Sequence, residues 1–451
     1  MVEQDKNIDE IKSVKPQKRM RINPPDRDAH ERIKDFDEVN EGFTDELAIL
    51  EAERCLDCKD PGCVKGCPVD IDIPKFIMQI KSNKVEDAYD TILKSHAFPS
   101  ITGRVCPQEK QCEALCVYNK MGRAVNIGKL ERYVGDKIRD KKTKKNQQQH
   151  ADKKFTHSVG IVGSGPAAMA LAADLLKADI KPVIYEAFDK LGGVLVYGIP
   201  EFRLPKSIVK DEIENLIALG MEINYGTIVG KSISFEELLK RHDYLFIAGG
   251  AGLPRLMNVP GEDLNHVLTA NEFLTRVNLL NANRSDYKTP MPLGETVAVI
   301  GGGNVAMDAA RVARRYYKSV DLYYRRNIEN MSARVEEIDH AVEEGINMHF
   351  GYSPVEIKEG EIVFTKNGEE STQKADVVVI AIGTEPNKLI NYDKENIKTQ
   401  NGLVLVDENL MTNNPRIYAG GDVVTGAATV ILAYQSGRIA AKNIIKNLKE
   451  R

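Results

Sequence analysis

Apolar residues along the chain follow two different patterns. Between residues 41 and 140 they recur at helical spacing, and no segment there has the pattern of a strand. After residue 154, short apolar runs are each followed by a glycine-containing turn, which is typical of parallel β–α–β units. The pattern therefore predicts a helical N-terminal region followed by α/β folding. The helices expected in the first region are 45–52, 73–82, 85–94 and 127–138.

The order strand, glycine turn, helix, strand occurs twice after residue 154. Two units of the same kind predict two nucleotide-binding domains built on parallel sheets. The first copy comprises strand 158–162, helix 167–177 and strand 182–185, and the second comprises strand 296–300, helix 305–314 and strand 320–324. Further expected elements are strands 244–247, 377–382 and 416–419 and a helix at 429–448.

Two polar segments lack either pattern. Residues 1–40 are polar and basic, so we expect an extended arm. Residues 141–154 (KKTKKNQQQHADKK) contain a single apolar Ala, which is typical of a solvated linker between domains.

Composition narrows the class of protein. Hydrophobic residues make up 42% and charged residues 28%, which excludes a fully disordered chain, a collagen and a coiled coil. A formal charge of −4 gives no sign of a nucleic-acid binder. No apolar run approaches the roughly 20 residues of a membrane span, and the N-terminus lacks the apolar core of a secretory signal. We expect a soluble, cytoplasmic protein.

The cysteines indicate a metal site. All seven lie between residues 55 and 116, a clustering that in a reducing compartment favours metal binding over disulfides. The run C-x₂-C-x₄-C-x₃-C-P resembles the spacing of iron–sulfur proteins, and zinc remains the alternative. Two four-iron clusters need eight ligands, so one corner requires another residue or an open iron. The candidate ligands are Cys55, Cys58, Cys63, Cys67, Cys106, Cys112 and Cys116.

The first glycine turn has the form G-x-G-x-x-A. Gly163 permits the tight turn, and Gly165 lets a pyrophosphate approach the N-terminus of the helix that follows. Glu186 ends the second strand, where a carboxylate can accept both hydroxyls of an adenosine ribose. The turn could also be non-functional, but the strand, the helix and the acid together favour dinucleotide binding.

The second glycine turn, at Gly301 and Gly303, has the same geometry but no acid at the end of the strand that follows its helix. The position equivalent to the ribose-binding acid is Tyr324, and Arg325 and Arg326 follow it. Guanidinium groups pair with a 2′-phosphate that a carboxylate would repel, so the sequence favours NADPH over NADH. The alternative is two solvated arginines at the end of a strand. A third turn ends in Asp422, which taken alone is equally well an ordinary turn residue.

The motifs together resemble a known family over about residues 35–451. The segments that carry the resemblance are the cysteine run 55–68, TGRVCPQEKQCEALC (102–116), NIGKLERYV (126–134), GSGPAAM (163–169), GGVLVYGIPEFRLPK (192–206), GGGNVAMDAAR (301–311), YYRR (323–326) and IYAGGD (417–422). They look like the NADPH-dependent glutamate synthase small subunit family. That family includes the larger subunit of the NADH-dependent reduced ferredoxin:NADP oxidoreductase (Nfn) and the N-terminal module of dihydropyrimidine dehydrogenase.

The resemblance implies an α-helical domain with two [4Fe–4S] clusters, then a glutathione-reductase-like FAD domain with an inserted NADPH-binding, Rossmann-like domain. The implied domains are residues 1–140 for the clusters, 141–154 as linker, 155–267 and 386–451 for FAD, and 268–385 for NADPH. The implied ligands are Cys55, Cys58, Cys63 and Cys116 for one cluster, and Cys67, Cys106, Cys112 and Glu131 for the other. Without the resemblance, Glu131 would be taken for a surface helix residue.

The resemblance also implies the residues that bind FAD and NADPH. They are Gly163, Ser164, Gly165, Pro166, Ala167, Glu186, Gly193, Arg203, Gly421, Asp422, Gly301, Gly303, Asn304, Val305, Asp308, Arg325 and Arg326. Hydride transfer to a flavin needs no protein nucleophile, so we nominate no catalytic acid or base.

The implied function is an NADPH-linked flavo-iron–sulfur oxidoreductase subunit that exchanges electrons with a partner. The partner is a glutamate synthase large subunit or, alternatively, the ferredoxin-linked flavoprotein subunit of an electron-bifurcating Nfn complex. A hypothesis of another class is a zinc-stapled binding module without redox function.

Overall fold

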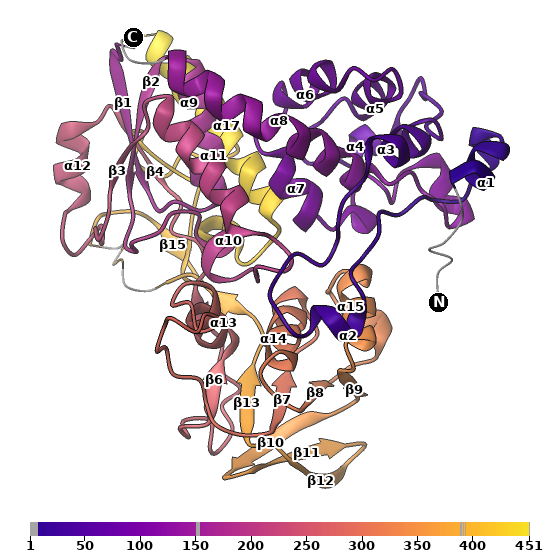
Figure 1. The fold of residues 1–451 in the computed structure, drawn as a ribbon. Helices are drawn as coiled ribbons and strands as arrows, with labels where there is room; N and C mark the ends of the chain where they lie inside the picture. Colours follow the sequence, from indigo (N-terminus) through magenta and orange to yellow (C-terminus); the bar gives the residue numbers. More distant parts are fainter. Residues whose placement is uncertain (1–7, 150–153, 388–389, 391, 393, 451) are drawn as a thin grey trace.

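The fold is that of a computed structural model, which describes residues 8–149, 154–387, 390, 392 and 394–450. Figure 1 shows an α-helical unit beside a first sheet unit, with a second sheet unit below them. The expected fold class, a helical region followed by two α/β units, is confirmed.

Across residues 41–149 of the described chain, the helical unit is built from five short helices and one long one, and side chains cap the first and the third of them. The Thr44 hydroxyl accepts a hydrogen bond from the Leu47 amide (3.3 Å), and Asp72 does the same for Lys75 (3.4 Å). The first three predicted helices are confirmed to within one residue at their ends. The elements are α3 (Asp45–Ala52), α4 (Gly62–Lys65), α5 (Ile73–Lys81), α6 (Val85–Leu93), α7 (Pro99–Val105) and α8 (Ile127–Gln149), with 3-10 turns η2 (Gln108–Lys110) and η3 (Val117–Met121).

Helix α8 is longer than the sequence pattern predicts. It continues to Gln149, so most of the segment expected as a linker is helical. Lysine and glutamine are good helix formers, and the segment 141–149 contains no glycine or proline to end the helix. Polarity alone therefore did not distinguish a helical extension from a coil. Residues 150–153 lie outside the described residues.

The expected extended arm is also wrong for residues 8–40. This segment contains α1 (Ile8–Ser13), a 3-10 turn η1 (Pro16–Lys18) and α2 (Ala29–Arg32). Arg19 and Arg32 are buried, and the Ile22 amide donates to a carboxylate oxygen of Glu51 (2.9 Å). The arginines can be buried here because carboxylates pair with them. Residues 1–7 lie outside the described part of the chain.

The first sheet is fully parallel, with strand order β17-β4-β1-β2-β3. Helices α9 and α17 pack against each other, so closely that a Cβ on Gly437 would lie 2.1 Å from the Ala167 carbonyl oxygen. The strands are β1 (His157–Val162), β2 (Ile180–Tyr185), β3 (Glu222–Asn224), β4 (Tyr244–Ile247) and β17 (Ile417–Ala419). The helices are α9 (Pro166–Lys177), α10 (Val194–Tyr197), α11 (Lys206–Ala218), α12 (Phe235–Arg241), α16 (Asp422–Thr425) and α17 (Val430–Lys449).

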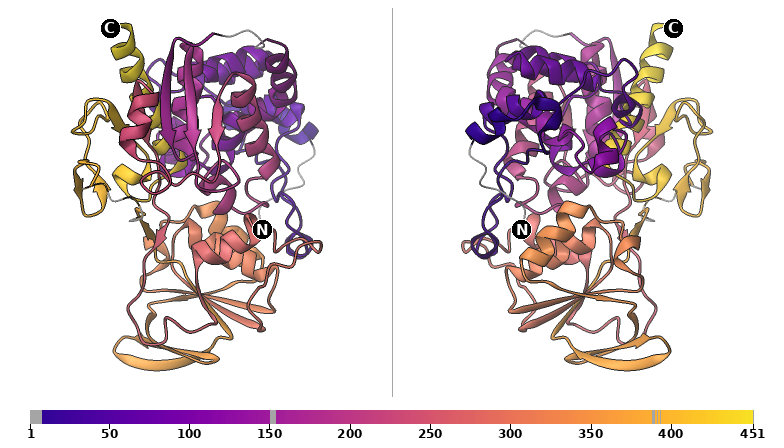
Figure 2. Two further views of the ribbon diagram at one scale, coloured as in Figure 1. Left: turned by 90° about the vertical axis from the view of Figure 1, so that its left-hand side faces the viewer. Right: turned by 90° about the vertical axis from the view of Figure 1, so that its right-hand side faces the viewer.

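The second sheet is also parallel, in the order β6-β13-β7-β8-β9. Its strands are β6 (Val267–Thr269), β7 (Thr296–Ile300), β8 (Ser319–Tyr324), β9 (Asn347–Phe350) and β13 (Val377–Ile380). Its helices are α13 (Ala270–Asn278), α14 (Asn304–Arg314) and α15 (Val335–Glu343), with a 3-10 turn η4 (Ile328–Asn330). An antiparallel sheet of β10 (Ser353–Lys358), β11 (Glu361–Lys366) and β12 (Glu369–Lys374) lies at the far end of this unit (Figure 2).

The second sheet unit is inserted into the first. The chain leaves the first sheet after β4, builds the whole second sheet, and returns for β17. The two crossings lie side by side, because β5 (Leu253–Pro254) pairs antiparallel with β14 (Thr384–Glu385). The remaining pair is β15 (Thr399–Gln400) with β16 (Leu403–Val404).

The hydrophobic cores follow a different division from the sheets. One continuous core joins the helical unit to α9 and α17 of the first sheet unit, so these two parts are packed as one body. The second sheet has separate cores on its two faces, one under α13 and α14 and one against the antiparallel sheet. Across the described residues, no helix combines the length and apolarity needed to cross a bilayer.

Candidate functional site

The first glycine turn joins β1 to α9 and is open above the helix. Gly163 has φ +93°, and a Cβ there would lie 2.5 Å from the Ala248 carbonyl oxygen, so only glycine fits. A Cβ on Gly165 would meet nothing within 4 Å, and Pro166 and Ala167 begin the helix. The space beside Gly165 at this helix end is therefore open, as the close approach of a phosphate requires.

Glu186 is held beside this turn. Its carboxylate accepts hydrogen bonds from the Ser164 hydroxyl (2.5 Å) and the Phe188 amide (3.0 Å). The Ser164 oxygen in turn accepts from the Gly192 amide (3.1 Å). The acid is buried and lies at the end of β2, the position from which it can accept ribose hydroxyls.

Two further predicted loops close around the same turn. A Cβ on Gly193 would lie 3.0 Å from the Gly165 Cα, and one on Gly421 would lie 3.1 Å from the Ala167 Cβ. Burial raises the pKa of Asp422 to about 6. Asp422 Oδ1 accepts a hydrogen bond from the Ala428 amide (3.3 Å), and a cofactor role for this carboxylate stays a prediction.

Tyr197 is a residue of this site that the sequence reasoning missed. It ends α10 and follows Gly193, and burial raises its pKa to about 12, with the nearby carboxylates of Asp422 and Glu186 adding to the shift. The available signal in the sequence was that Tyr197 lies inside the GGVLVYGIP segment. Only the fold brings Tyr197 beside Asp422 and Glu186.

The second glycine turn joins β7 to α14. Gly301 has φ +152°, and a Cβ there would lie 2.3 Å from the Ala381 carbonyl oxygen. Gly303 caps the helix without a side chain, and Val305 in the first helical turn is exposed. The Asn304 side-chain oxygen accepts from the Arg334 amide (2.9 Å), so this residue fixes the loop that passes the turn.

Arg325 and Arg326 follow β8 and are exposed. Neither has a hydrogen bond or ion pair to another residue in the part of the chain that the structure describes. Tyr324 lies under the glycine turn, because a Cβ on Gly302 would meet its ring at 2.6 Å. The two guanidinium groups therefore stand at the edge of the second turn with their donors available.

Arg203 and Asp308, both expected to contact a cofactor, form a buried ion pair with each other. Arg203 Nη1 lies 2.7 Å from each carboxylate oxygen of Asp308, and its Nε lies 3.0 Å from Glu337. The pair links the loop after α10 to α14 and so joins the two sheet units. A cofactor role for either residue stays a prediction.

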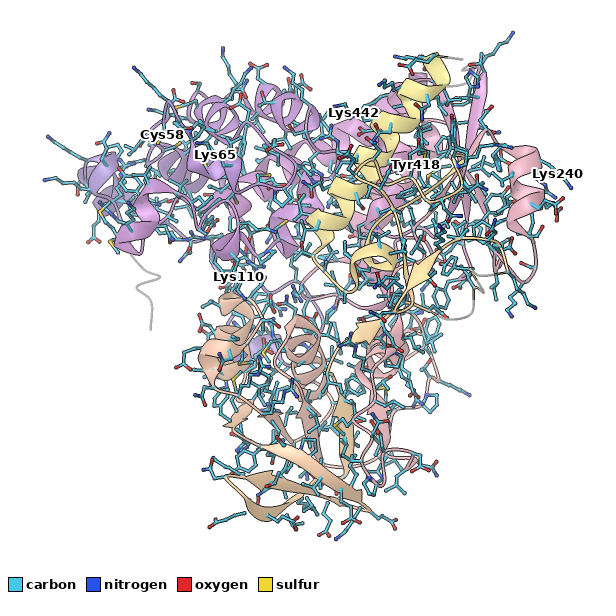
Figure 3. All side chains as sticks on the ribbon, turned by 180° about the vertical axis from the view of Figure 1, so that it is seen from behind. Cys58, Lys65, Lys110, Lys240, Tyr418 and Lys442 are labelled. Atoms are coloured by element: carbon cyan, nitrogen blue, oxygen red, sulfur yellow. The ribbon has the colours of Figure 1, made fainter. Side chains whose placement is uncertain are left out.

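Four cysteines gather at the outer end of the helical unit. Burial raises the pKa of Cys63 to about 12, and the neighbouring thiols of Cys55, Cys116 and Cys58 raise it further. The two cysteine segments touch, because a Cβ on Gly62 would lie 2.5 Å from the Leu115 carbonyl oxygen. Figure 3 shows Cys58 far from Tyr418 of the first sheet unit. These four are the predicted ligands of one cluster.

The other three cysteines gather around Glu131 of α8. Burial, with Glu131 and Cys67 nearby, raises the pKa of the Cys106 thiol well above its usual range. Cys112 is buried and has the same neighbours. Burial also raises the pKa of Glu131 to about 7, and its side chain is almost inaccessible. The alternative of a surface helix residue is wrong, and the structure brings this acid together with three thiols.

The chemistry of both groups fits iron–sulfur ligation. Buried thiols and a buried carboxylate are stabilised as anions when a metal replaces their protons. No three His, Cys, Asp or Glu side chains within the described ranges are arranged to hold a single metal ion. One ion needs its ligands to converge on a point, whereas a four-iron cluster gives each thiolate its own iron.

The second ligand group lies against α17 of the first sheet unit. The Gln435 amide donates to the Pro68 carbonyl oxygen, next to Cys67. Tyr434 stacks on Phe98 with ring centroids 5.2 Å apart. Helix α17 begins shortly after the Asp422 turn, so one helix connects the two candidate sites.

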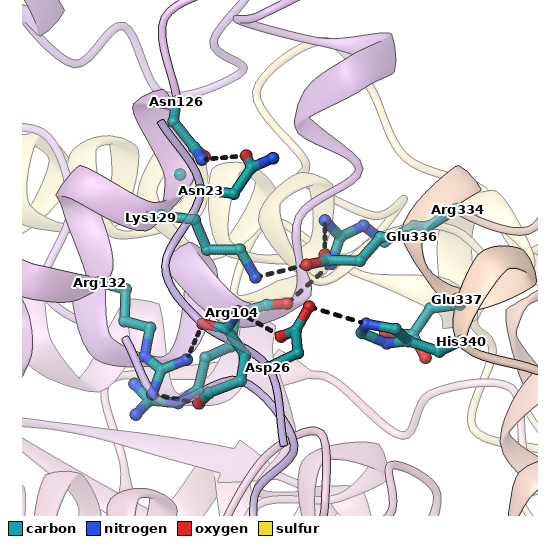
Figure 4. Close-up of polar contacts among 12 residues, drawn as sticks. Asn23, Asp26, Arg104, Asn126, Lys129, Arg132, Arg334, Glu336, Glu337 and His340 are labelled. Carbon is teal, nitrogen blue, oxygen red and sulfur yellow. Dashed lines mark hydrogen bonds and ion pairs between the residues drawn. The ribbon is translucent and has the colours of Figure 1, made fainter. Parts of the chain in front are cut away.

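Contacts of charged side chains hold the second sheet unit against the helical unit. The sequence pattern did not predict these contacts. Lys110 Nζ donates to the carbonyl oxygens of Ser332 (3.0 Å) and Ala333 (3.3 Å), and Figure 3 shows Lys110 at this junction. Figure 4 shows the surrounding contacts, including Asp26 with His340 (3.3 Å). The chain between Cys106 and Cys112 therefore touches the loop beside the second glycine turn.

Family models and relatives agree with this arrangement. Residues 32–143 match the model "dihydropyrimidine dehydrogenase domain II, 4Fe-4S cluster", and residues 157–437 match "pyridine nucleotide-disulphide oxidoreductase". The glutamate synthase [NADPH] small chain of Azospirillum brasilense is 34% identical over 93% of each chain. The NAD-dependent dihydropyrimidine dehydrogenase subunit PreT homolog of Salmonella typhi is 32% identical over 92% of this chain and 98% of that one.

Among solved structures, FprA from Mycobacterium tuberculosis in complex with NADPH is similar in fold, with a TM-score of 0.55 and 21% identity over 65% of this chain and 85% of that one. An iron–sulfur domain joined to this two-sheet fold defines an NADPH-linked flavo-iron–sulfur oxidoreductase. The chain belongs to the family of NADPH-dependent glutamate synthase small chains.

Proposed function

We propose that the chain binds FAD at the Gly163 turn, NADPH at the Gly301 turn and one [4Fe–4S] cluster on each ligand group, and passes electrons singly to a partner subunit. The observation that carries the proposal is the contact of α17 with the second ligand group. The helix links the turn that would hold the flavin to the residues that would hold a cluster.

The bound groups supply the redox chemistry: a flavin accepts hydride and releases single electrons, and iron–sulfur clusters carry them. The chain's own residues bind these groups and orient them. Arg325 and Arg326 pair with the 2′-phosphate of NADPH, because guanidinium groups bind phosphate bidentately. Glu186 accepts the ribose hydroxyls of FAD, and the open helix ends of α9 and α14 receive the two pyrophosphates.

The positions of the two ligand groups suggest the order of electron flow. The group with Cys67, Cys106 and Glu131 is buried against the first sheet unit, whereas Cys58 of the other group is partly exposed at the outer end of the molecule (Figure 3). We place the Glu131 group next to the flavin and the Cys58 group next to the partner.

The partner determines the net reaction. The Azospirillum brasilense relative is named as a glutamate synthase small chain, so we propose a glutamate synthase large subunit as the partner. The flow can also run in reverse and reduce NADP⁺. We propose FAD-domain boundaries at 155–266 and 386–451, one residue earlier at the first crossing than the family resemblance implies, because β6 of the second sheet begins at Val267.

The test uses anaerobically purified protein and an artificial one-electron acceptor. NADPH should bleach the flavin and drive reduction of the acceptor, and a large subunit should add glutamate formation from glutamine and 2-oxoglutarate. Flavin bleaching without reduction of the acceptor would contradict electron delivery through the clusters. A colourless protein that contains zinc and no iron would support the binding module instead. Reduction of ferredoxin without glutamate formation would contradict the glutamate synthase partner.

A further inference from the structure

The Thr102 hydroxyl lies between Glu131 and His96. Thr102 Oγ1 is 2.5 Å from Glu131 Oε1 and 2.7 Å from His96 Nε2. The three side chains come from α7, α8 and the segment before α7, and all three are buried. They form one hydrogen-bonded chain that ends on the acid beside the second group of cysteines.

The direction of this chain follows from the protons available. A carboxylate that binds iron has no proton and can only accept hydrogen bonds. Thr102 has one hydroxyl proton, so it donates to Glu131, and its lone pair is left to accept from His96 Nε2. The Phe98 carbonyl oxygen, 3.2 Å from the same hydroxyl, is the weaker competitor for the proton because it is farther away.

The hydrogen bond from Thr102 involves one of the two carboxylate oxygens of Glu131. Oε1 of Glu131 accepts the hydrogen bond from Thr102, and Oε2 accepts none from any residue that the structure describes. We propose that Thr102 and His96 are positioning residues that present Glu131 to the cluster through Oε2 alone, as a monodentate ligand. The inference rests on the proposed function, in which Glu131 fills the corner that the cysteines leave. Hydrogen bonds to ligating carboxylates are a general way of orienting a metal ligand.

His96 is itself held by aromatic rings. Its ring centroid lies 5.1 Å from that of Tyr434 and 6.1 Å from that of Phe98. Tyr434 belongs to α17, so the first sheet unit fixes the imidazole that orients Thr102. The orientation of Glu131 therefore depends on the docking of the helical unit against the first sheet unit.

The test compares Thr102→Val, which keeps the shape and removes the hydroxyl, with Thr102→Ser, which keeps the hydroxyl. The readouts are the electron paramagnetic resonance spectrum of each reduced cluster and the rate at which an iron chelator removes iron. In Thr102→Val the second-cluster signal should shift and its iron should be lost about 10-fold faster, the lower end of the range for partners of metal ligands. Thr102→Ser should match the wild type, and the first-cluster signal should not change in either variant.

A second pair of variants keeps the test decisive if Thr102→Val does not fold. His96→Gln retains an N–H donor toward Thr102, whereas His96→Leu does not, so only His96→Leu should shift the second-cluster signal. Wild-type spectra in Thr102→Val and His96→Leu, with an altered spectrum in Glu131→Ala, would overturn the positioning role and leave the ligand in place. An unaltered spectrum in Glu131→Ala as well would instead overturn Glu131 as a ligand.

Discussion

Lys129 of α8 and Glu336 of α15 form an ion pair, with 2.6 Å between Nζ and Oε1 (Figure 4). Lys129 lies two residues before the predicted cluster ligand Glu131, and Glu336 lies two residues after Arg334, whose amide binds Asn304 at the second glycine turn. The pair therefore connects the helix that would hold a cluster to the loop beside the NADPH turn. The positions of the predicted cluster site and of the NADPH turn therefore depend on each other.

This pair should make stability depend on pH. Despite burial, Lys129 and Arg334 hold the pKa of Glu336 well below its usual value of 4.5. A depressed pKa stabilises the fold above the unfolded value, and that stability is lost as the pH falls below it. Between about pH 5 and pH 3, wild-type protein should lose more stability than Glu336→Gln. Urea unfolding at each pH measures the difference, and Glu408→Gln, which removes an exposed carboxylate, is the control.

Removing Arg325 and Arg326 should weaken NADPH binding. Charge-assisted bonds to a phosphate are worth roughly 1.5–3 kcal/mol each and rarely add fully, so the double alanine variant should lose ~2–4 kcal/mol. NADH lacks the 2′-phosphate, and its affinity should hardly change. Titration calorimetry of both coenzymes checks this, with Arg284→Ala as an exposed arginine control. Equal losses for both coenzymes would mean that these arginines do not bind the 2′-phosphate.

Glu186→Ala should weaken FAD binding without affecting NADPH. The variant removes the acceptor for the ribose hydroxyls and the partner of the Ser164 hydroxyl. Hydrogen bonds to a charged group are worth about 1.5–3 kcal/mol, so the dissociation constant should rise more than tenfold. Flavin fluorescence during rebinding to deflavinated protein measures it. Glu222→Ala, which removes an exposed acid of β3, should bind FAD like the wild type.

Glu131→Ala should perturb one cluster only. FAD and NADPH binding should remain, and hydride transfer to the flavin should persist, while electron delivery to a one-electron acceptor falls. Glu131→Gln should be milder, because an amide oxygen can still reach iron. Both reduced-cluster spectra and the reductase rate report the effect. If both spectra and the full rate survive in Glu131→Ala, the acid is not a ligand.

The glycine turns could be predicted from the sequence because their requirements are local. Gly163 and Gly301 each need a positive φ and no Cβ, and strand, turn and helix follow one another along the chain. The length of α8 could not be predicted, because polarity does not separate a solvated helix from a coil. The packing of the N-terminal segment was equally hidden, since Arg32 pairs with Glu344 across a separation of 312 residues.

The Glu131 site was still harder to predict from the sequence. Seven cysteines indicated a missing ligand, but the spacing did not say which residue would fill the corner. Only the family resemblance pointed to Glu131, and only the fold shows that it is buried beside Cys67 and Cys106. The hydrogen-bonded chain through Thr102 and His96 could not be predicted from the sequence, because it depends on the packing of α7, α8 and α17.

The iron content of two single-cysteine variants tests the division into two clusters most directly. Anaerobically reconstituted wild-type protein should contain one FAD, about eight irons and about eight acid-labile sulfides per chain. Cys58→Ser should disturb only the first cluster and Cys106→Ser only the second, so each should fall toward about four irons and retain the other cluster's signal. Wild-type protein that never exceeds about four irons, or a variant that loses both signals while its FAD remains bound, would contradict two separately held clusters.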